Sequence, residues 1–220
     1  MPGGEFVSGH NAPRLRTSHW GRRSLHIYYL MNDAPHGTAA RAAPGRSPLV
    51  WILAGESSGD LYGARLAREL RQALGADLRI AGMGSAQMRA AGVELLVDSA
   101  ELGVVGAVEV LALLPTFIRI FVSLWRRALK DRPDVVIPID YPGFNLRFAR
   151  VMWWAGIPVC WYISPQVWAW GKRRIPQLAR YCRKMLVIFP FEPQTYAGSG
   201  LQVEFVGHPL VEIVAERREP

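Results

Sequence analysis

Apolar residues are arranged along this chain in two alternating patterns, which predict repeated units of strand and helix. Short apolar runs rich in β-branched residues are typical of strands buried on both faces of a parallel sheet. Such runs fall at Pro48–Ala54, Leu78–Ala81, Val93–Val97, Val135–Ile139, Pro158–Ile163, Lys184–Phe189 and Val203–Val206. Between them apolar residues recur at helical spacing, as from Leu61 to Leu74. This alternation predicts an α/β fold with a Rossmann-like, doubly wound parallel sheet.

The stretch Asp134–Asn145 contains the strand that we expect to be most buried. Val135–Ile139 holds only apolar residues and a proline, and Asp140 follows at its carboxyl end. A Pro-Gly turn then leads into a helix expected from about Phe144 to Trp154. Ligands of open α/β sheets bind outside the carboxyl ends of the strands, which favours a chemical role for Asp140. An Asx-turn or a helix cap is the alternative role.

Other polar residues follow predicted strands in the same manner. The sequence GESSGD at 55–60 is a glycine turn between a strand and a helix, and its backbone N–H groups suit a phosphate or a sugar. It is neither a Walker loop nor a GxGxxG dinucleotide site, and helix capping is the alternative role for Ser58 and Asp60. Because strand ends share one edge of a sheet, we expect one rim to hold Glu56, Asp60, Asp140, Gln166 and His208.

Aromatic residues gather after the predicted strand Pro158–Ile163. Three tryptophans occur between Trp161 and Trp170, and aromatic faces suit sugar rings and interfaces. Packing within the core is the alternative for these side chains. For His208, which lies between a glycine and a proline, the alternative is a backbone contact rather than chemistry.

The most apolar part of the chain is ELGVVGAVEVLALLPTFIRIFVSLW at 101–125. We expect Pro115 to begin a helix here, with basic residues in its last turn. A core helix is one interpretation of this segment. Apolar residues nearly all round the helix, next to basic ones, also fit a helix that rests in a membrane interface or holds acyl chains.

The formal net charge of +8 indicates an anionic partner. No acidic residue occurs from Tyr141 to Phe191. The basic residues of this stretch are Arg147, Arg150, Lys172, Arg173, Arg174, Arg180, Arg183 and Lys184. Because no zinc-finger or RNP-type motif is present, we expect a membrane lipid or a phosphate and no nucleic acid.

The cysteines, the first residues and one long uncharged run bear on whether the chain has disulfides, a metal site, a signal peptide or a transmembrane helix. Cys160 and Cys182 show no CxxC spacing, so we expect reduced core residues rather than a disulfide or a metal site. Residues 1–47 lack lasting periodicity and predict a disordered extension with only a weak likeness to a signal peptide, which leaves Met31 as a candidate start. Glycine and proline interrupt the uncharged run 151–171, which favours a strand and a loop over a transmembrane helix.

Seven motifs, in order, resemble the lipid-A-disaccharide synthases, a family of membrane-associated glycosyltransferases. They are AGESSGDLYGA (54–64), GMGSAQMRAAG (82–92), ELGVVGAVEVL (101–111), PDVVIPIDYPGFN (133–145), GIPVCWYISPQVWAW (156–170), FPFEP (189–193) and FVGHPL (205–210). The resemblance covers the chain from Pro48 to about Leu210. It implies the amino-terminal domain of a two-domain GT-B fold over residues 48–210, followed by part of a linker at 211–220.

The family's reaction implies substrates, partners and roles for single residues. A UDP-2,3-diacylglucosamine donor reacts with 2,3-diacylglucosamine 1-phosphate (lipid X), with inversion, release of UDP and no metal or organic cofactor. By motif position Asp140 matches the general base. The matching substrate-binding positions are Glu56, Ser58, Asp60, Asn145, Gln166, Trp168 and His208. The implied location is cytoplasmic, on the inner face of the inner membrane, where the segment 101–125 matches the family's apolar patch.

The resemblance extends to one half of the family's fold. The second Rossmann-like domain, which supplies most UDP contacts and the dimer interface, has no match in this sequence. We therefore expect the chain alone to lack most of the donor site and to form a homodimer only when that half is supplied. Two alternatives stay open: a non-catalytic membrane or lipid-binding module, and another GT-B enzyme that uses UDP-sugars.

Overall fold

The computed structural model describes residues 27, 46–102 and 110–216, which form one parallel sheet with helices on both faces. The strands are β1 (Leu49–Ala54), β2 (Arg79–Gly84), β3 (Glu94–Asp98), β4 (Val135–Ile139), β5 (Cys160–Tyr162), β6 (Lys184–Val187) and β7 (Gln202–Phe205). The α-helices are α2 (Ser57–Leu74), α3 (Ala86–Ala90), α4 (Val110–Asp131), α5 (Pro142–Trp154), α6 (Val167–Trp170), α7 (Ile175–Tyr181), α8 (Glu192–Thr195) and α9 (Pro209–Glu216). Short 3₁₀ turns occupy Ser99–Leu102 and Lys172–Arg174.

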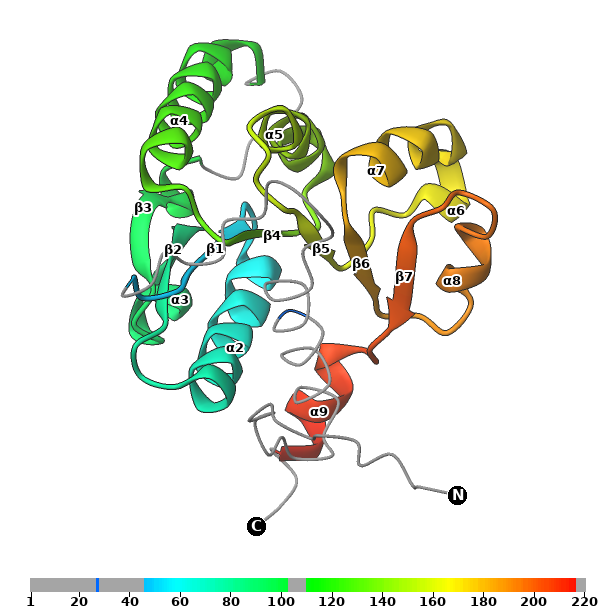
Figure 1. Ribbon diagram of the computed structural model, residues 1–220, viewed down its shortest axis with the longest axis horizontal. Helices are drawn as coiled ribbons and strands as arrows, with labels where there is room; N and C mark the ends of the chain where they lie inside the picture. Colours follow the sequence, from blue (N-terminus) through cyan, green and yellow to red (C-terminus); the bar gives the residue numbers. More distant parts are fainter. Residues whose placement is uncertain (1–26, 28–45, 103–109, 217–220) are drawn as a thin grey trace, which may run out of the picture.

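The strand order is β3-β2-β1-β4-β5-β6-β7, and every neighbouring pair runs parallel. In Figure 1 the helices α4, α5 and α7 cover one face of the sheet, and α2 and α9 lie on the other. Each face has its own apolar core, so a strand such as β1 buries Ile52 on one side and Trp51 on the other. The predicted doubly wound α/β fold is confirmed.

The central strand β4 is buried along its whole length, as its apolar sequence predicts. On the β5 side, the N–H groups of Val136 and Asp140 donate to the carbonyls of Pro158 (2.9 Å) and Tyr162 (3.1 Å). Pro138 stands between these two donors and has no N–H, so the ladder is interrupted where its middle bond would form. The last bond of this ladder therefore fixes Asp140 against the end of β5.

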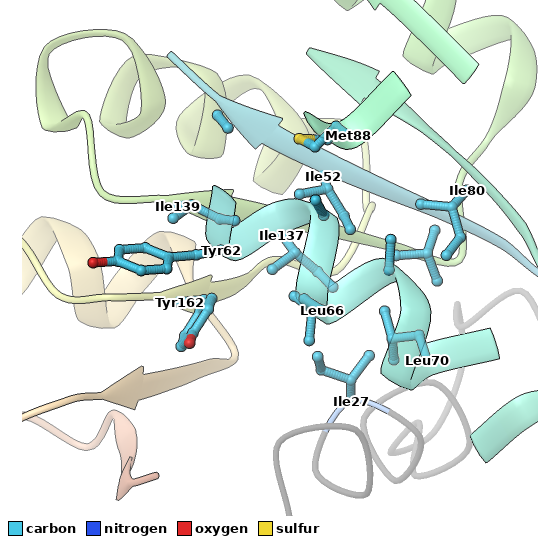
Figure 2. Close-up of a cluster of buried hydrophobic side chains, with 14 of the residues drawn as sticks. Ile27, Ile52, Tyr62, Leu66, Leu70, Ile80, Met88, Ile137, Ile139 and Tyr162 are labelled. Atoms are coloured by element: carbon cyan, nitrogen blue, oxygen red, sulfur yellow. The ribbon is translucent and has the colours of Figure 1, made fainter. Parts of the chain in front are cut away.

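Figure 2 shows the core on the α2 face, where Leu66 and Leu70 lie between α2 and the sheet. Ile27 is helical and fully buried in the same cluster. Apart from Ile27, Arg46 and Ser47, the predicted extension 1–47 lies outside the described residues. The domain boundaries stay predictions.

Three local expectations were wrong. The strand predicted to end at Ala81, before Gly82 and Gly84, instead continues through both glycines as β2 and ends at Gly84. Pro115 does not begin a helix but lies inside α4, and residues 103–109 of the apolar segment lie outside the described residues. The expected loop after β5 contains the short helix α6.

The two cysteines are buried and unpaired, as expected for core residues. Burial raises the pKa of the Cys160 thiol to about 12 and raises that of Cys182 as well, which keeps both thiols protonated and unreactive. No helix within the described ranges combines the length and the apolar character that crossing a bilayer requires.

Candidate active site

The tip of β4 has an unusual backbone that fixes the direction of two side chains. Asp140 and Tyr141 have φ angles of 43° and 49°, a left-handed conformation that non-glycine residues seldom adopt. The buried Asn145 side chain, one turn into α5, holds this shape: its Nδ2 donates to the carbonyl oxygens of Asp140 (2.7 Å) and Ile139 (3.3 Å). Asn145 thus supports the strand end from below. Strained residues that their surroundings hold so firmly are typical of functional sites.

The Asp140 carboxyl is partly buried and stands beside a second acid. Burial raises its pKa, and the negative charge of Glu56 raises it further, while a hydrogen bond from the Tyr141 backbone lowers it in part. Glu56 is exposed and directly precedes α2. The structure therefore brings together two of the predicted rim residues. It makes Asp140 a better proton acceptor than an ordinary aspartate, once ionised.

Asp60, in the first turn of α2 after β1, has the contacts of the alternative role, that of a helix cap. Its side chain is 3% exposed and accepts hydrogen bonds from the backbone N–H groups of Ser85 (2.6 Å), Gln87 (2.9 Å) and Met88 (3.2 Å). These groups begin α3, so Asp60 joins α2 to α3 as a helix cap. Ser58 lies exposed in the first turn of α2.

We expect Asp60→Ala to lower the free energy of unfolding by about 2–4 kcal/mol, because three backbone N–H groups lose a buried carboxylate acceptor. Urea unfolding followed by circular dichroism measures the change. Ser58→Ala, in the same turn of α2 but exposed, is the matched control and should stay within about 0.5 kcal/mol of the parent. Equal stability of the Asp60→Ala chain and the parent would refute the capping role.

A strip of aromatic rings lies at the carboxyl ends of β5, β6 and β7. Trp168 is 39% exposed and meets Phe191 edge to face at 5.3 Å between ring centroids. Phe189 stacks on Phe191 at 5.5 Å and meets His208 at 5.6 Å. His208 also accepts a hydrogen bond from the backbone of Leu210 through Nδ1, at 3.2 Å. Sequence reasoning singled out the tryptophan and the histidine, but it missed the phenylalanines that join them.

Gln166 is exposed and directly precedes α6, at the same edge as the aromatic strip. The strip and Gln166 follow the strands from β5 onward, whereas Asp140 and Glu56 follow β4 and β1. The candidate site thus has an acidic part in the middle of the sheet and an aromatic part toward the β7 edge.

An apolar hollow of about 470 Å³ adjoins the acidic part, between α4 and α5. Its lining consists of Leu114, Phe117, Ile118, Phe121, Tyr141, Gly143, Phe144 and Arg147. The volume and the mostly apolar lining are those of a small-molecule site. The sequence analysis did not identify Tyr141 as a site residue. Its position directly after Asp140 was the one sequence feature that could have indicated it.

The outward side of α4 is both apolar and basic. Leu114, Ile118, Trp125 and Leu129 are exposed there. The same helix lines a second hollow of about 460 Å³ formed by Arg119, Val122, Ser123, Arg126, Arg127 and Lys130. Apolar and cationic side chains on one helix fit an anionic lipid surface. No cluster of three or more metal-ligating side chains was found in the described ranges.

Comparisons with known proteins point to one family. A family model described as lipid-A-disaccharide synthetase matches residues 50–219. The lipid-A-disaccharide synthase of Trichlorobacter lovleyi is 48% identical over 172 residues, which are 78% of this chain and 45% of the relative. The Koribacter versatilis protein of that name is 47% identical (74% and 43% covered), and the Neisseria gonorrhoeae protein is 43% identical (77% and 43%). The chain spans less than half the length of these curated relatives.

Proposed function

Because this chain belongs to the lipid-A-disaccharide synthase family, we propose that it carries the acceptor side of the glycosyl transfer that joins two acylated glucosamines. The donor is UDP-2,3-diacylglucosamine and the acceptor is 2,3-diacylglucosamine 1-phosphate. The 6-hydroxyl oxygen of the acceptor forms a bond to the anomeric carbon of the donor, and the bond from that carbon to UDP breaks. The products are a β-1,6-linked disaccharide 1-phosphate and UDP.

The position and acidity of Asp140 are the observation that carries this proposal. Its carboxylate accepts the proton that the acceptor hydroxyl loses as the new bond forms. The raised pKa suits this role, since a more basic carboxylate takes the proton more readily. The Asn145 bonds to the carbonyl oxygens of Ile139 and Asp140 fix the backbone that carries the carboxyl group, which lowers the entropy cost of the transition state.

The hollow between α4 and α5 receives hydrocarbon of the acceptor in this proposal. It begins at Tyr141, the residue next to the proposed base, so a lipid with its sugar at Asp140 has its chain directed toward the hollow. Its lining offers Phe117, Phe121 and Phe144 to hydrocarbon. Each methylene that leaves water there contributes about 0.8 kcal/mol to binding.

The inner membrane is the proposed partner surface, met from its cytoplasmic face. Besides the exposed apolar and basic residues of α4, the end of α5 carries Trp153 and Trp154 at the surface. Each ring is covered by an arginine, Arg180 at 4.6 Å and Arg150 at 4.5 Å. Tryptophan beside a cation is typical of side chains that sit among lipid headgroups.

The remaining part of the longer relatives supplies most UDP contacts and the dimer interface in this proposal. The test mixes the purified chain with the carboxyl-terminal portion of the Trichlorobacter lovleyi relative and both lipid substrates, and measures UDP release and disaccharide by mass spectrometry. Product is expected only from the pair. A folded pair that forms no product, beside an active intact relative, would contradict the enzyme proposal. Vesicle binding without turnover would then favour a lipid-binding module.

A further inference from the structure

We propose that Tyr141 is a specificity-determining residue, whose ring separates the reacting end of the acceptor from its hydrocarbon chain and sets which chains the hollow accepts. This inference rests on the proposed function. The residue lies between the two parts of the site: its backbone follows Asp140 directly, and its side chain lines the hollow.

The ring has fixed contacts on two sides. On the side of the hollow it stacks on Phe144, with centroids 6.4 Å apart and planes inclined by 29°. On the other side it covers the turn after β1, where a Cβ on Gly55 would overlap the ring and lie 2.7 Å from its Cε1 atom. The ring can pack against this turn only because residue 55 is glycine and has no side chain. The ring fills the space between that turn and α5 like a wall.

The acidic side of the wall differs chemically from the apolar side. Burial raises the pKa of the Tyr141 hydroxyl, and the nearby charge of Glu56 raises it too, so this hydroxyl stays protonated and is a hydrogen-bond donor. The opposite face of the ring meets Phe144 and the rest of the hollow. A sugar and a hydrocarbon chain that share one ligand are thereby kept in separate compartments.

The left-handed backbone keeps the wall in position. The φ of 49° at Tyr141 and the Asn145 bond to the preceding carbonyl fix the direction in which the side chain leaves the backbone, and the contacts with Gly55 and Phe144 hold the ring there. A wall of fixed position limits the length and bulk of the chain beside it. Removal of the ring joins the hollow to the space beside Asp140, so that longer chains gain room while short chains lose an aromatic contact.

The test uses the whole chain with hexyl, octyl, decyl and dodecyl β-glucosides as monomers, titrated by calorimetry. For the parent we expect affinity to rise about fourfold per methylene and then to level off once the hollow is filled. Tyr141→Ala should weaken octyl glucoside binding on the order of tenfold and move the levelling to longer chains. The affinity of Tyr141→Phe, which keeps the ring, should stop rising at the same alkyl length as that of the parent.

Phe205→Ala is the matched control, since this exposed aromatic residue lies at the end of β7, outside the hollow, and its loss should leave the whole series unchanged. Thermal unfolding of each variant confirms that it is folded. The inference would be overturned if the affinity of Tyr141→Ala stopped rising at the same alkyl length as that of the parent, or if Tyr141→Phe shifted this length as much as Tyr141→Ala does. A parent whose affinity does not depend on alkyl length would overturn it too. None of these results depends on UDP release, so the proposed function is judged separately.

Discussion

Replacement of Asp140 by asparagine is expected to lower disaccharide formation by the reconstituted pair about 10²- to 10⁴-fold, the range for loss of a general base. Asparagine keeps the size of the side chain and adopts the left-handed backbone at least as easily as aspartate. The loss is therefore one of proton transfer rather than of folding. Initial rates of UDP release, together with circular dichroism, measure both quantities.

The same substitution is expected to stabilise the chain at neutral pH. The folded-state pKa of Asp140 is raised, so the fold prefers the protonated acid. This preference favours folding below the unfolded-state pKa of about 3.9 and is lost as the pH rises through the folded-state pKa. At neutral pH the ionised carboxylate therefore lowers the free energy of unfolding, and asparagine removes this destabilisation. The melting temperatures of the parent and of Asp140→Asn, measured from about pH 4 to about pH 8, should diverge as the pH rises, with the variant the more stable.

Glu56→Gln is the companion variant for this prediction. It removes the second of the two causes that raise the pKa of Asp140, so the acidic limb of the pH profile should move to lower pH while turnover at neutral pH persists. Full activity of the Asp140→Asn pair would contradict the assignment of the base. An Asp140→Asn chain that melts lower at every pH would show a structural role instead.

Gly82→Ala is expected to prevent folding, with a loss of more than about 4 kcal/mol. A Cβ at this position in β2 would overlap the carbonyl oxygen of Ile52 and lie 2.8 Å from its carbonyl carbon, and the φ of 150° is unfavourable for any side chain. Both strands pair with a neighbour on each side, β2 with β3 and β1, and β1 with β2 and β4, so neither backbone has room to move away. Yield of soluble chain and urea unfolding are the measurements.

Gly143→Ala is the matched control, because a Cβ there meets nothing within 4 Å. Gly143 lies in the first turn of α5, where alanine should leave the stability unchanged or raise it by about 0.5–1 kcal/mol. A soluble, cooperatively unfolding Gly82→Ala chain would show that β1 and β2 can separate, contrary to this expectation.

The buried strands and the position of Asp140 were predictable because their signal is local. A run such as Val135–Ile139 must be buried on both faces, and the residue after it must lie at the sheet edge. The glycines at 82 and 84 gave a misleading signal. Glycine commonly marks a turn, whereas Gly82 is needed because the neighbouring strand approaches closely, and that contact is not visible in a sequence.

The roles of Asp60 and Tyr141 depended on contacts between distant segments. Asp60 has the sequence position of a rim residue, but α3 begins within reach of its carboxylate, and three N–H groups bind it there. Tyr141 follows the proposed base along the chain, yet its part in the hollow depends on α4 packing beside α5. Such roles follow from tertiary packing and not from local pattern.

The hollow shares two residues of its lining with the outer surface of α4, since Leu114 and Ile118 belong to both and are more than half exposed, at 51% and 55%. In the proposed function, an acyl tail that leaves a bilayer against this helix contacts these two apolar side chains before it enters the hollow. It never has to be immersed in water, where each methylene would add about 0.8 kcal/mol to the barrier. If the proposed function holds, the substrate moves sideways from the bilayer into the hollow, and the rate of its capture is expected to follow diffusion within the leaflet.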